Sequence, residues 1–344
     1  MKKILSLLLA MLLIFSLVAC TSSEPTPAEP QNPEESSGDS EEVITMRIAN
    51  ANAVGDVKDI ACNRFKELCA EKSNGRIDIE VFSGGQLGST ADTIEGLAYG
   101  TNEIVIEGLS LLAPYCALAD IEAVPYMFTS YEEYNKFISG ELWDEFVETI
   151  GSEGGFKVLG AMYRGARVTT SKKYFSTPEE LAACGLKIRV PNTQMYIKTW
   201  ETLKTTPTPL DLSDTFTALQ QNTVEAQENA TVESYGFGFG DVTSYLVKTN
   251  HAYSTNVFMF DRKYFEALPE DIQAILEEAA DETSAYINEY MLAKVSEYED
   301  KFAADGVEVV EVDTTKFAAL FDTFVEDNFP QFEEWVGRIK DYVK

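Results

Sequence analysis

The sequence has few of the residues that catalytic and metal sites use most. Its 344 residues include one histidine, His251, and five cysteines. No two cysteines form a CxxC pair, and one histidine makes a Cys/His zinc site unexpected. GxSxG, HExxH and Walker motifs are absent. GFGFGD at 236–241 has an aspartate where the GxGxxG pattern of a dinucleotide-binding loop has its last glycine. We therefore expect no enzymatic activity, no cofactor and no metal.

Basic residues are also scarce. Lysine and arginine total 27 against 57 aspartate and glutamate residues, which gives a formal charge of −30. Nucleic acids bind to clusters of basic residues, and such clusters are missing, so nucleic acid is not an expected partner. A small anionic ligand would need a local cationic site, because the protein as a whole repels it.

The only long apolar run lies at the N-terminus. Residues 4–18 are apolar, follow Lys2 and Lys3, and lead into LVAC at 17–20. The run is too short to span a bilayer comfortably, and a small residue before a cysteine resembles a lipoprotein signal. The resemblance implies cleavage before Cys20 and attachment of lipid to its thiol. A plain signal peptide is the alternative.

The next segment, TSSEPTPAEPQNPEESSGDSEE, contains no basic and no large apolar residue. Such a composition cannot bury enough surface to offset the entropy of ordering. We expect residues 1–20 to be a lipoprotein signal peptide and residues 21–42 to be a disordered acidic tether. The tether would hold a globular unit near the membrane, outside the cytoplasm.

The four cysteines after Cys20 are expected to be free and to act as small core residues. Cys62 and Cys69 are seven residues apart in a helix pattern, which separates them by roughly 10 Å, too far for a disulfide. Pairing of Cys116 with Cys184 stays open.

From residue 43 onward, strand patterns alternate with helix patterns. Strands are predicted at VITMRIAN (43–50), RIDIEVF (76–82) and EIVIEG (103–108). Helices are predicted over residues 57–74 and 89–100, and the second begins at a serine and ends at a glycine. This alternation favours α/β domains with buried, mostly parallel sheets.

The C-terminal third contains one uninterrupted helix pattern, from Pro269 to about Asp305. Proline suits the first turn of a helix, and Gly306 suits its end. At ~1.5 Å per residue the helix would be roughly 55 Å long, more than the width of one small domain. It must protrude or lie across two domains.

A few polar residues occur in otherwise apolar surroundings. Arg189 lies in the strand pattern LKIRVP, and a buried guanidinium there would need an anionic partner. Arg164 and Arg167 precede a pair of threonines, and Asn229 ends QEN at the start of a helix pattern. Considered singly, each of these residues, like His251, is more often structural than functional.

Six stretches resemble, in order and spacing, those of TRAP-transporter substrate-binding proteins of the DctP type. They are GRIDIEVFSGGQLGS, VPYMFTSYEE, YRGARVTTSKK, LKIRVPN, PTPLDLSDTFTALQQNTVEAQEN and TNHAY. The resemblance covers about residues 45–330. It implies a two-domain, periplasmic-binding-protein-like α/β fold with hinge strands and a long helix that spans both domains. Domain I would be residues 43–164 plus 255–294, and domain II residues 165–254 plus 295–344.

The resemblance also implies a ligand-binding site. Arg189 of KIRVP would form a bidentate pair with a ligand carboxylate, for which a planar guanidinium suits better than lysine. Arg167 would assist the same carboxylate, and Asn229 would hydrogen-bond the bound acid. Asn192 and Asn256 match positions that line the cleft in sialic-acid-binding members.

The chain also departs from the family pattern. The usual VDGQEN is VEAQEN here. The domain I positions that contact ligand in sialic-acid binders correspond to Ala51, Thr90 and Gly108, which argues against sialic acid. We expect their neighbours Asn52 and Glu107 to contact the ligand instead.

We therefore expect a lipid-anchored, extracytoplasmic solute-binding protein of a TRAP transporter. It would be a monomer that binds a small organic acid, such as a dicarboxylate, a sugar acid or a similar monocarboxylate. It would deliver this acid to the TRAP membrane subunits. The alternatives are a binding protein of an ATP-driven importer, an extracellular enzyme acting on acidic sugars, and a ligand sensor that docks on a membrane receptor.

Overall fold

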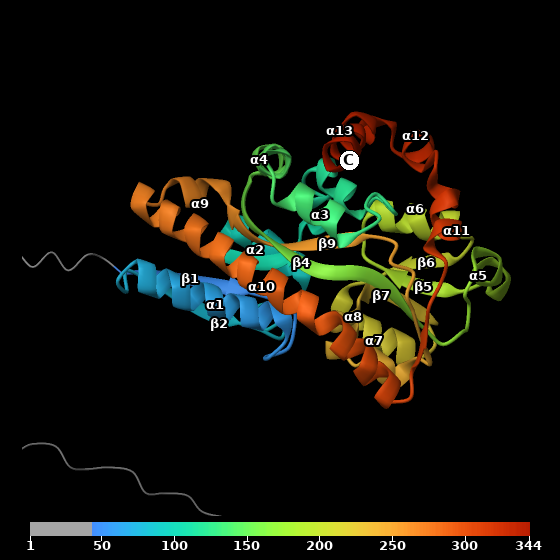
Figure 1. The fold of residues 1–344 in the computed structure, drawn as a ribbon. Coiled ribbons are helices and arrows are strands. Elements are labelled where there is room, and N and C mark those ends of the chain that lie inside the picture. The colour runs from blue at the N-terminus through green and yellow to red at the C-terminus, as the bar shows by residue number, and fades with distance from the viewer. Residues whose placement is uncertain (1–42) are drawn as a thin grey trace, which may run out of the picture. The chain divides into compact units, whose positions relative to one another are not determined.

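The computed structural model describes residues 43–344 (Figure 1). The predicted signal peptide, the tether and Cys20 lie outside the described residues. Within the described part, no helix is both long enough and apolar enough to cross a membrane.

One sheet of ten strands forms the centre of the described structure. Eight strands lie side by side in the order β2 (Ile77–Phe82), β1 (Ile44–Ala49), β3 (Ile104–Gly108), β9 (Tyr253–Asp261), β4 (Phe156–Ser171), β7 (Ala226–Ala230), β5 (Lys187–Val190) and β6 (Thr206–Pro209). In addition, β8 (Tyr245–Val247) pairs with β4, and β10 (Glu308–Val310) pairs with β8.

The N-terminal elements agree with the sequence prediction. The three predicted strands are β1, β2 and β3, and the two predicted helices are α1 (Val57–Lys72) and α2 (Thr90–Tyr99). Helix α2 begins with a capping box between Ser89 and Asp92 and ends at Gly100, which has a left-handed backbone. Local capping chemistry therefore sets both ends of this helix.

The sheet is mixed, which corrects the prediction of mostly parallel strands. Strand β1 is parallel to β2 and β3, β5 is parallel to β6 and β7, and β8 is parallel to β10. The pairs β3–β9, β9–β4, β4–β7 and β4–β8 are antiparallel. Burial of a strand on both faces does not depend on the direction of its neighbours, so the residue pattern did not reveal these antiparallel pairs.

Strands β4 and β9 join the two outer groups of parallel strands. Strand β4 has 16 residues, and its pairing with β9 shifts register twice, between Leu159 and Met162 and between Tyr163 and Ala166. Gly160, in the first irregularity, has φ +74°. Such bulges bend and twist a strand at a defined place.

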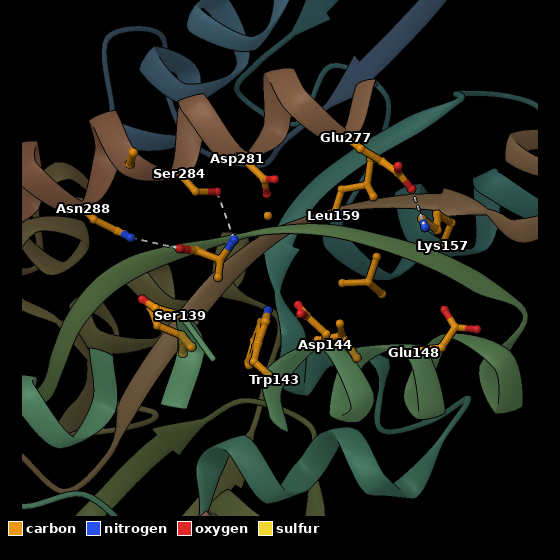
Figure 2. A pocket seen from close by; sticks show the side chains of 16 residues that line it. Ser139, Trp143, Asp144, Glu148, Lys157, Leu159, Glu277, Asp281, Ser284 and Asn288 are labelled. Carbon is orange, nitrogen blue, oxygen red and sulfur yellow. Dashed lines mark hydrogen bonds and ion pairs between the residues drawn. The ribbon is translucent and has the colours of Figure 1, made fainter. Parts of the chain in front are cut away.

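Side chains of the long helix α10 (Glu270–Ala304) hold the first bulge of β4 (Figure 2). The Ala161 amide donates to Ser284 Oγ at 2.9 Å, and Asn288 Nδ2 donates to the Ala161 carbonyl at 3.1 Å. The Tyr163 amide donates to Asn288 Oδ1 at 2.6 Å. The backbone groups that the bulge removes from the strand ladder are thus satisfied by the helix.

Helix α10 confirms the predicted long helix. It has 35 residues, begins after Pro269 and ends at Asp305, just before Gly306. At ~1.5 Å per residue it is roughly 52 Å long. It packs on α1, β4 and α8 (Thr231–Gly236), so it lies across both ends of the sheet (Figure 1).

The other helices connect the strands or cover the sheet. They are α3 (Tyr131–Ile138), α4 (Glu141–Gly154), α5 (Pro178–Cys184), α6 (Gln194–Thr202), α7 (Leu212–Gln220), α9 (Arg262–Glu266), α11 (Thr314–Ala318), α12 (Phe324–Asn328) and α13 (Glu333–Val343). Short 3₁₀ helices are η1 (Leu109–Leu112), η2 (Ala117–Ala123), η3 (Phe239–Val242), η4 (Ala319–Phe321) and η5 (Pro330–Phe332).

Cys62, Cys69, Cys116 and Cys184 are free, and the first three are buried. The prediction that these four are unpaired is confirmed, and the prediction that they belong to the core is confirmed for the first three, since Cys184 is only partly buried. The division into domain I and domain II stays a prediction.

The bulge at Gly160 yields a stability test. A Cβ built on Gly160 would lie 2.6 Å from Ser284 Oγ and 3.3 Å from the Ala280 carbonyl oxygen. Gly155 has a similar φ of +81°, but a Cβ there meets nothing within 4 Å. We expect Gly155→Ala to lower the free energy of unfolding by about 1 kcal/mol through backbone strain alone.

Gly160→Ala should lower the free energy of unfolding by about 1–3 kcal/mol more than Gly155→Ala does, because the bulge must also move away from α10. Urea denaturation of both variants measures the difference. Equal losses would show that α10 does not restrain the bulge.

Candidate ligand-binding site

A cavity of about 450 Å³ lies between the two ends of the sheet. One wall comes from the start of α2, from β3 and from η1. The other comes from β4, β5, β7 and the N-terminal ends of α6 and α7. This volume is within the range of small-molecule sites.

Three arginines line this cavity among the described residues: Arg164 and Arg167 on β4, and Arg189 on β5. All three are buried. A buried guanidinium keeps its charge only with compensation from nearby groups. The three differ in what compensates them.

Arg167 is paired with a carboxylate of the protein. Its Nε and Nη2 bind Glu228 Oε2 at 2.5 Å and Oε1 at 2.8 Å, a bidentate pair. Burial alone would raise the pKa of Glu228, but the charge and hydrogen bonds of Arg167, together with His251, lower it to about 2. Arg167 also stacks on Tyr196, with 4.8 Å between the guanidinium carbon and the ring centroid.

His251 holds the other side of Glu228. Its Nε2 lies 3.0 Å from Glu228 Oε2, and its Nδ1 lies 2.9 Å from Thr249 Oγ1. Burial lowers the pKa of His251 despite the neighbouring carboxylate, so the ring is neutral at pH 7. The single histidine therefore has the structural, hydrogen-bonded role that we expected of it.

Arg164 belongs to a second buried network. It forms an ion pair with Glu233, and its Nη2 donates to Asn229 Oδ1 at 3.3 Å. Lys58, fully buried, binds Glu107 Oε2 at 2.6 Å and lies 3.5 Å from Glu233 Oε1. Despite burial, the charges of Arg164 and Lys58 lower the pKa of Glu233 to about 2.

Arg189 has no carboxylate within ion-pair distance among residues 43–344. Its Nε and Nη2 donate to the Leu210 carbonyl at 2.9 and 2.7 Å. Burial lowers the pKa of Arg189 to about 10, so it stays charged at neutral pH. It is therefore the cavity's available cation.

The structure brings most of the predicted site residues to this cavity. Besides Arg189 and Arg167, the predicted residues Asn229, Asn192 and Glu107 line it. Asn229 is the fourth residue of strand β7, just before α8, rather than a residue of the helix. Its Oδ1 also accepts from the Ala230 amide at 2.9 Å, which leaves its amino group for a ligand.

Two predicted residues do not line the cavity. Asn52 and Asn256 are both buried elsewhere, the first before α1 and the second on β9 opposite Gly108. Asn256 belongs to β9, which lies between β3 and β4 in the sheet. Their expected ligand contacts stay predictions.

Sequence reasoning missed several lining residues. The cavity also includes Thr90, Ser110, Tyr196 and Asp211. Thr90 occupies a position that the family comparison in the sequence had identified as a ligand contact, so that signal was available. The pairing of Lys58 with Glu107 joins residues 49 positions apart and leaves no local pattern.

A larger hollow of about 610 Å³ lies between α4, β4 and α10. Figure 2 shows Asp144 of α4 and Asp281 of α10 pointing into it from opposite sides. Glu148 and Glu277 also line it, and Lys157 binds Glu277 at 2.7 Å. Burial, Asp144 and Glu277 raise the pKa of Asp281. An organic anion would be repelled here, so the arginine-lined cavity is the candidate site.

A cavity between two ends of an α/β sheet, with a buried unpaired guanidinium, is suited to binding a small anion. Residues 48–330 match the model of the DctP family, described as bacterial extracellular solute-binding protein, family 7. The chain therefore belongs to this family.

Solved structures of similar proteins carry sugar acids. A TRAP periplasmic solute-binding protein from Roseobacter denitrificans OCh 114, with bound L-galactonate, is 28% identical with a TM-score of 0.81, over 87% of this chain and 99% of that one. One from Ochrobacterium anthropi, with bound L-fuconate, is 29% identical with a TM-score of 0.81, over 88% and 100%.

Another similar protein is named for a dicarboxylate instead of a sugar acid. The C4-dicarboxylate-binding protein DctB of Bacillus subtilis (strain 168) is 28% identical over 251 residues, which are 72% of this chain and 70% of that protein. The family to which the chain belongs thus does not by itself tell a sugar acid from a dicarboxylate.

The contrast between Arg189 and Arg167 predicts opposite effects on stability. Glu228→Gln leaves the buried Arg167 charge unpaired and should lower the free energy of unfolding by about 3–5 kcal/mol. Arg189→Met removes a buried charge that has no carboxylate partner, so stability without ligand should be unchanged or higher, by up to about 2 kcal/mol.

Urea denaturation of the ligand-free proteins measures both effects. A loss in Arg189→Met as large as that in Glu228→Gln would mean that Arg189 is part of the folding core and not a reserved cation.

Proposed function

We propose that this protein binds the carboxylate of a small organic acid on Arg189 and delivers the acid to the membrane subunits of a TRAP transporter. The observation that carries the proposal is the buried Arg189 guanidinium, which has no carboxylate partner among the described residues. Two neighbouring arginines show what such a group requires, since each has its own glutamate.

The physical reason is the enclosed position of Arg189. A charge-assisted bidentate pair is stronger in a water-poor cavity than at the surface. A bound carboxylate would compensate the burial that now lowers the pKa of Arg189. The acidic exterior opposes anion capture only weakly, because salt screens exposed charges beyond about 8 Å.

The names of similar proteins support a sugar acid as the ligand, since two of the similar structures contain L-galactonate and L-fuconate. The same names favour TRAP transport over an ATP-driven importer, an enzyme acting on acidic sugars or a receptor-docking sensor. Hydroxyl and amide groups of Ser89, Thr90, Ser110 and Asn229 line the cavity and match a polyhydroxy acid.

We further propose that the domains given above, residues 43–164 plus 255–294 and residues 165–254 plus 295–344, close on the ligand. Strands β4 and β9 cross between them, and the bulges of β4 supply bending points. Lipid attachment at Cys20 would keep the monomer near the membrane subunits. Arg167 would then assist the ligand carboxylate while its Nε and Nη2 hold Glu228.

The test begins with a thermal-shift screen of sugar acids, dicarboxylates, keto acids and aromatic acids. The acid with the largest shift is then titrated by calorimetry. Arg189→Ala should weaken binding at least 100-fold, and Arg189→Lys at least tenfold, because an ammonium lacks the planar fork. Lys187→Ala is the matched control, since Lys187 lies on the same strand but is exposed.

We expect the Lys187→Ala variant to bind within twofold of the original protein. Retention of full affinity by Arg189→Ala would refute the role of Arg189. Turnover of the bound acid, followed by chromatography, would favour an enzyme instead.

A further inference from the structure

We propose that the cavity accepts a single negative charge, so that the ligand is a polyhydroxy monocarboxylate and dicarboxylates are rejected by Glu107. This inference rests on the proposed function and defines its substrate class. Similar proteins are named for ligands of both kinds, so the choice is made by this chain's own residues.

The available positive charge in the cavity is limited. Of the three lining arginines, Arg164 already has Glu233 and Arg167 already has Glu228. Only Arg189 has no carboxylate partner among the described residues. A ligand with one carboxylate therefore finds one free guanidinium, and a second carboxylate finds none.

The occupied arginines cannot readily change partners. Arg167 binds both carboxylate oxygens of Glu228 and also its main-chain carbonyl, at 3.1 Å, while His251 holds the same carboxylate. Both side chains are almost fully buried. The charge of Arg167 is therefore already balanced by Glu228. Balancing a second ligand carboxylate with it would leave Glu228 without a compensating charge in the interior, which is strongly unfavourable.

The wall formed by α2, β3 and η1 carries acceptors of its own. Glu107 Oε2 binds Lys58, and its Oε1 has one hydrogen bond, from Thr90 Oγ1 at 3.2 Å. This oxygen can accept a hydrogen bond from a ligand hydroxyl. A carboxylate has no proton to donate, so the same oxygen repels it.

Other carboxylates near the cavity also disfavour a second ligand carboxylate. Asp211 lines it, with Oδ1 committed to the amide of Ser213 at 3.0 Å and to its hydroxyl at 2.9 Å. Glu122 lies behind the cavity and accepts from the Ser110 amide at 3.1 Å. Neither has a free cation beside it that a second ligand carboxylate could use.

The sharpest test compares L-galactonate with galactarate. The two have the same carbon chain, and galactarate carries a carboxylate where L-galactonate has a terminal hydroxyl. Calorimetric titration of the intact protein should show galactarate at least 100-fold weaker than L-galactonate. Succinate should also bind at least 100-fold more weakly.

A substitution tests the assigned residue. Glu107→Gln removes the repelling charge but keeps the side-chain shape, and Lys58 retains Glu233 at 3.5 Å. It should reduce the preference for L-galactonate over galactarate at least tenfold. Glu95→Gln is the matched control, because it removes one exposed charge on helix α2, whose start belongs to the same wall as Glu107, without lining the cavity. It should leave the preference unchanged.

The outcomes separate the two proposals. The single-charge inference is overturned if galactarate or succinate binds as tightly as L-galactonate. The proposed function stays intact in that case, provided that Arg189→Ala still abolishes binding. An unchanged preference in Glu107→Gln overturns the assignment to Glu107. Absence of binding of every acid in the screen overturns the proposed function and this inference with it.

Discussion

The buried and unpaired guanidinium of Arg189 is the constraint on which the site depends. Burial of a charge is unfavourable unless a partner compensates it, and this chain compensates its other buried cations fully. Arg167 has Glu228, Arg164 has Glu233, and Lys58 has Glu107. Because those pairs are closed, the cavity keeps a defined shape and a defined charge. An unpaired cation in such surroundings stabilises a bound anion more than it stabilises the fold, which is the compromise expected at a binding site.

The fold brings these charges together through its antiparallel strands. Arg164 and Arg167 lie on β4, Glu228 and Asn229 on the adjacent β7, and Arg189 on the next strand, β5. On the other side of β4, strand β9 leads to β3, which carries Glu107. The crossing pair β4–β9 therefore joins the two walls of the cavity. The first bulge of β4 lies in this same pair, and Ser284 and Asn288 of α10 bind its backbone. The long helix therefore contacts the place where the two walls are connected.

Much of the fold could be predicted because the signals are local. Helix α2 has its cap residues and periodicity within one short segment, and α10 has a continuous apolar stripe with Pro269 before it and Gly306 after it. The direction of strand pairing could not be predicted, because most residues of β4 and β9 are buried and burial suits either direction. The bulge at Gly160 depends on hydrogen bonds from residues more than 120 positions away, and a glycine in a strand pattern indicates an irregularity without its partner.

The residues of the site could largely be predicted from the sequence, but the pairing of their charges could not. The strand pattern around Arg189 indicated burial, and the family motifs indicated ligand binding. Neither showed whether a carboxylate of the protein reaches Arg189, because that depends on residues from other strands. Arg167 illustrates the difficulty, since its partner Glu228 is 61 residues away and the same motifs indicated only that Arg167 assists the ligand carboxylate. Asn52 and Asn256 were expected at the ligand for similar reasons and are buried outside the cavity. Motifs identify which residue types meet in a family's cleft, whereas the distribution of ion pairs in one chain decides how many charges remain for the ligand. The number of unpaired cations is therefore a property of the assembled structure, and it is the property from which we infer a monocarboxylate ligand.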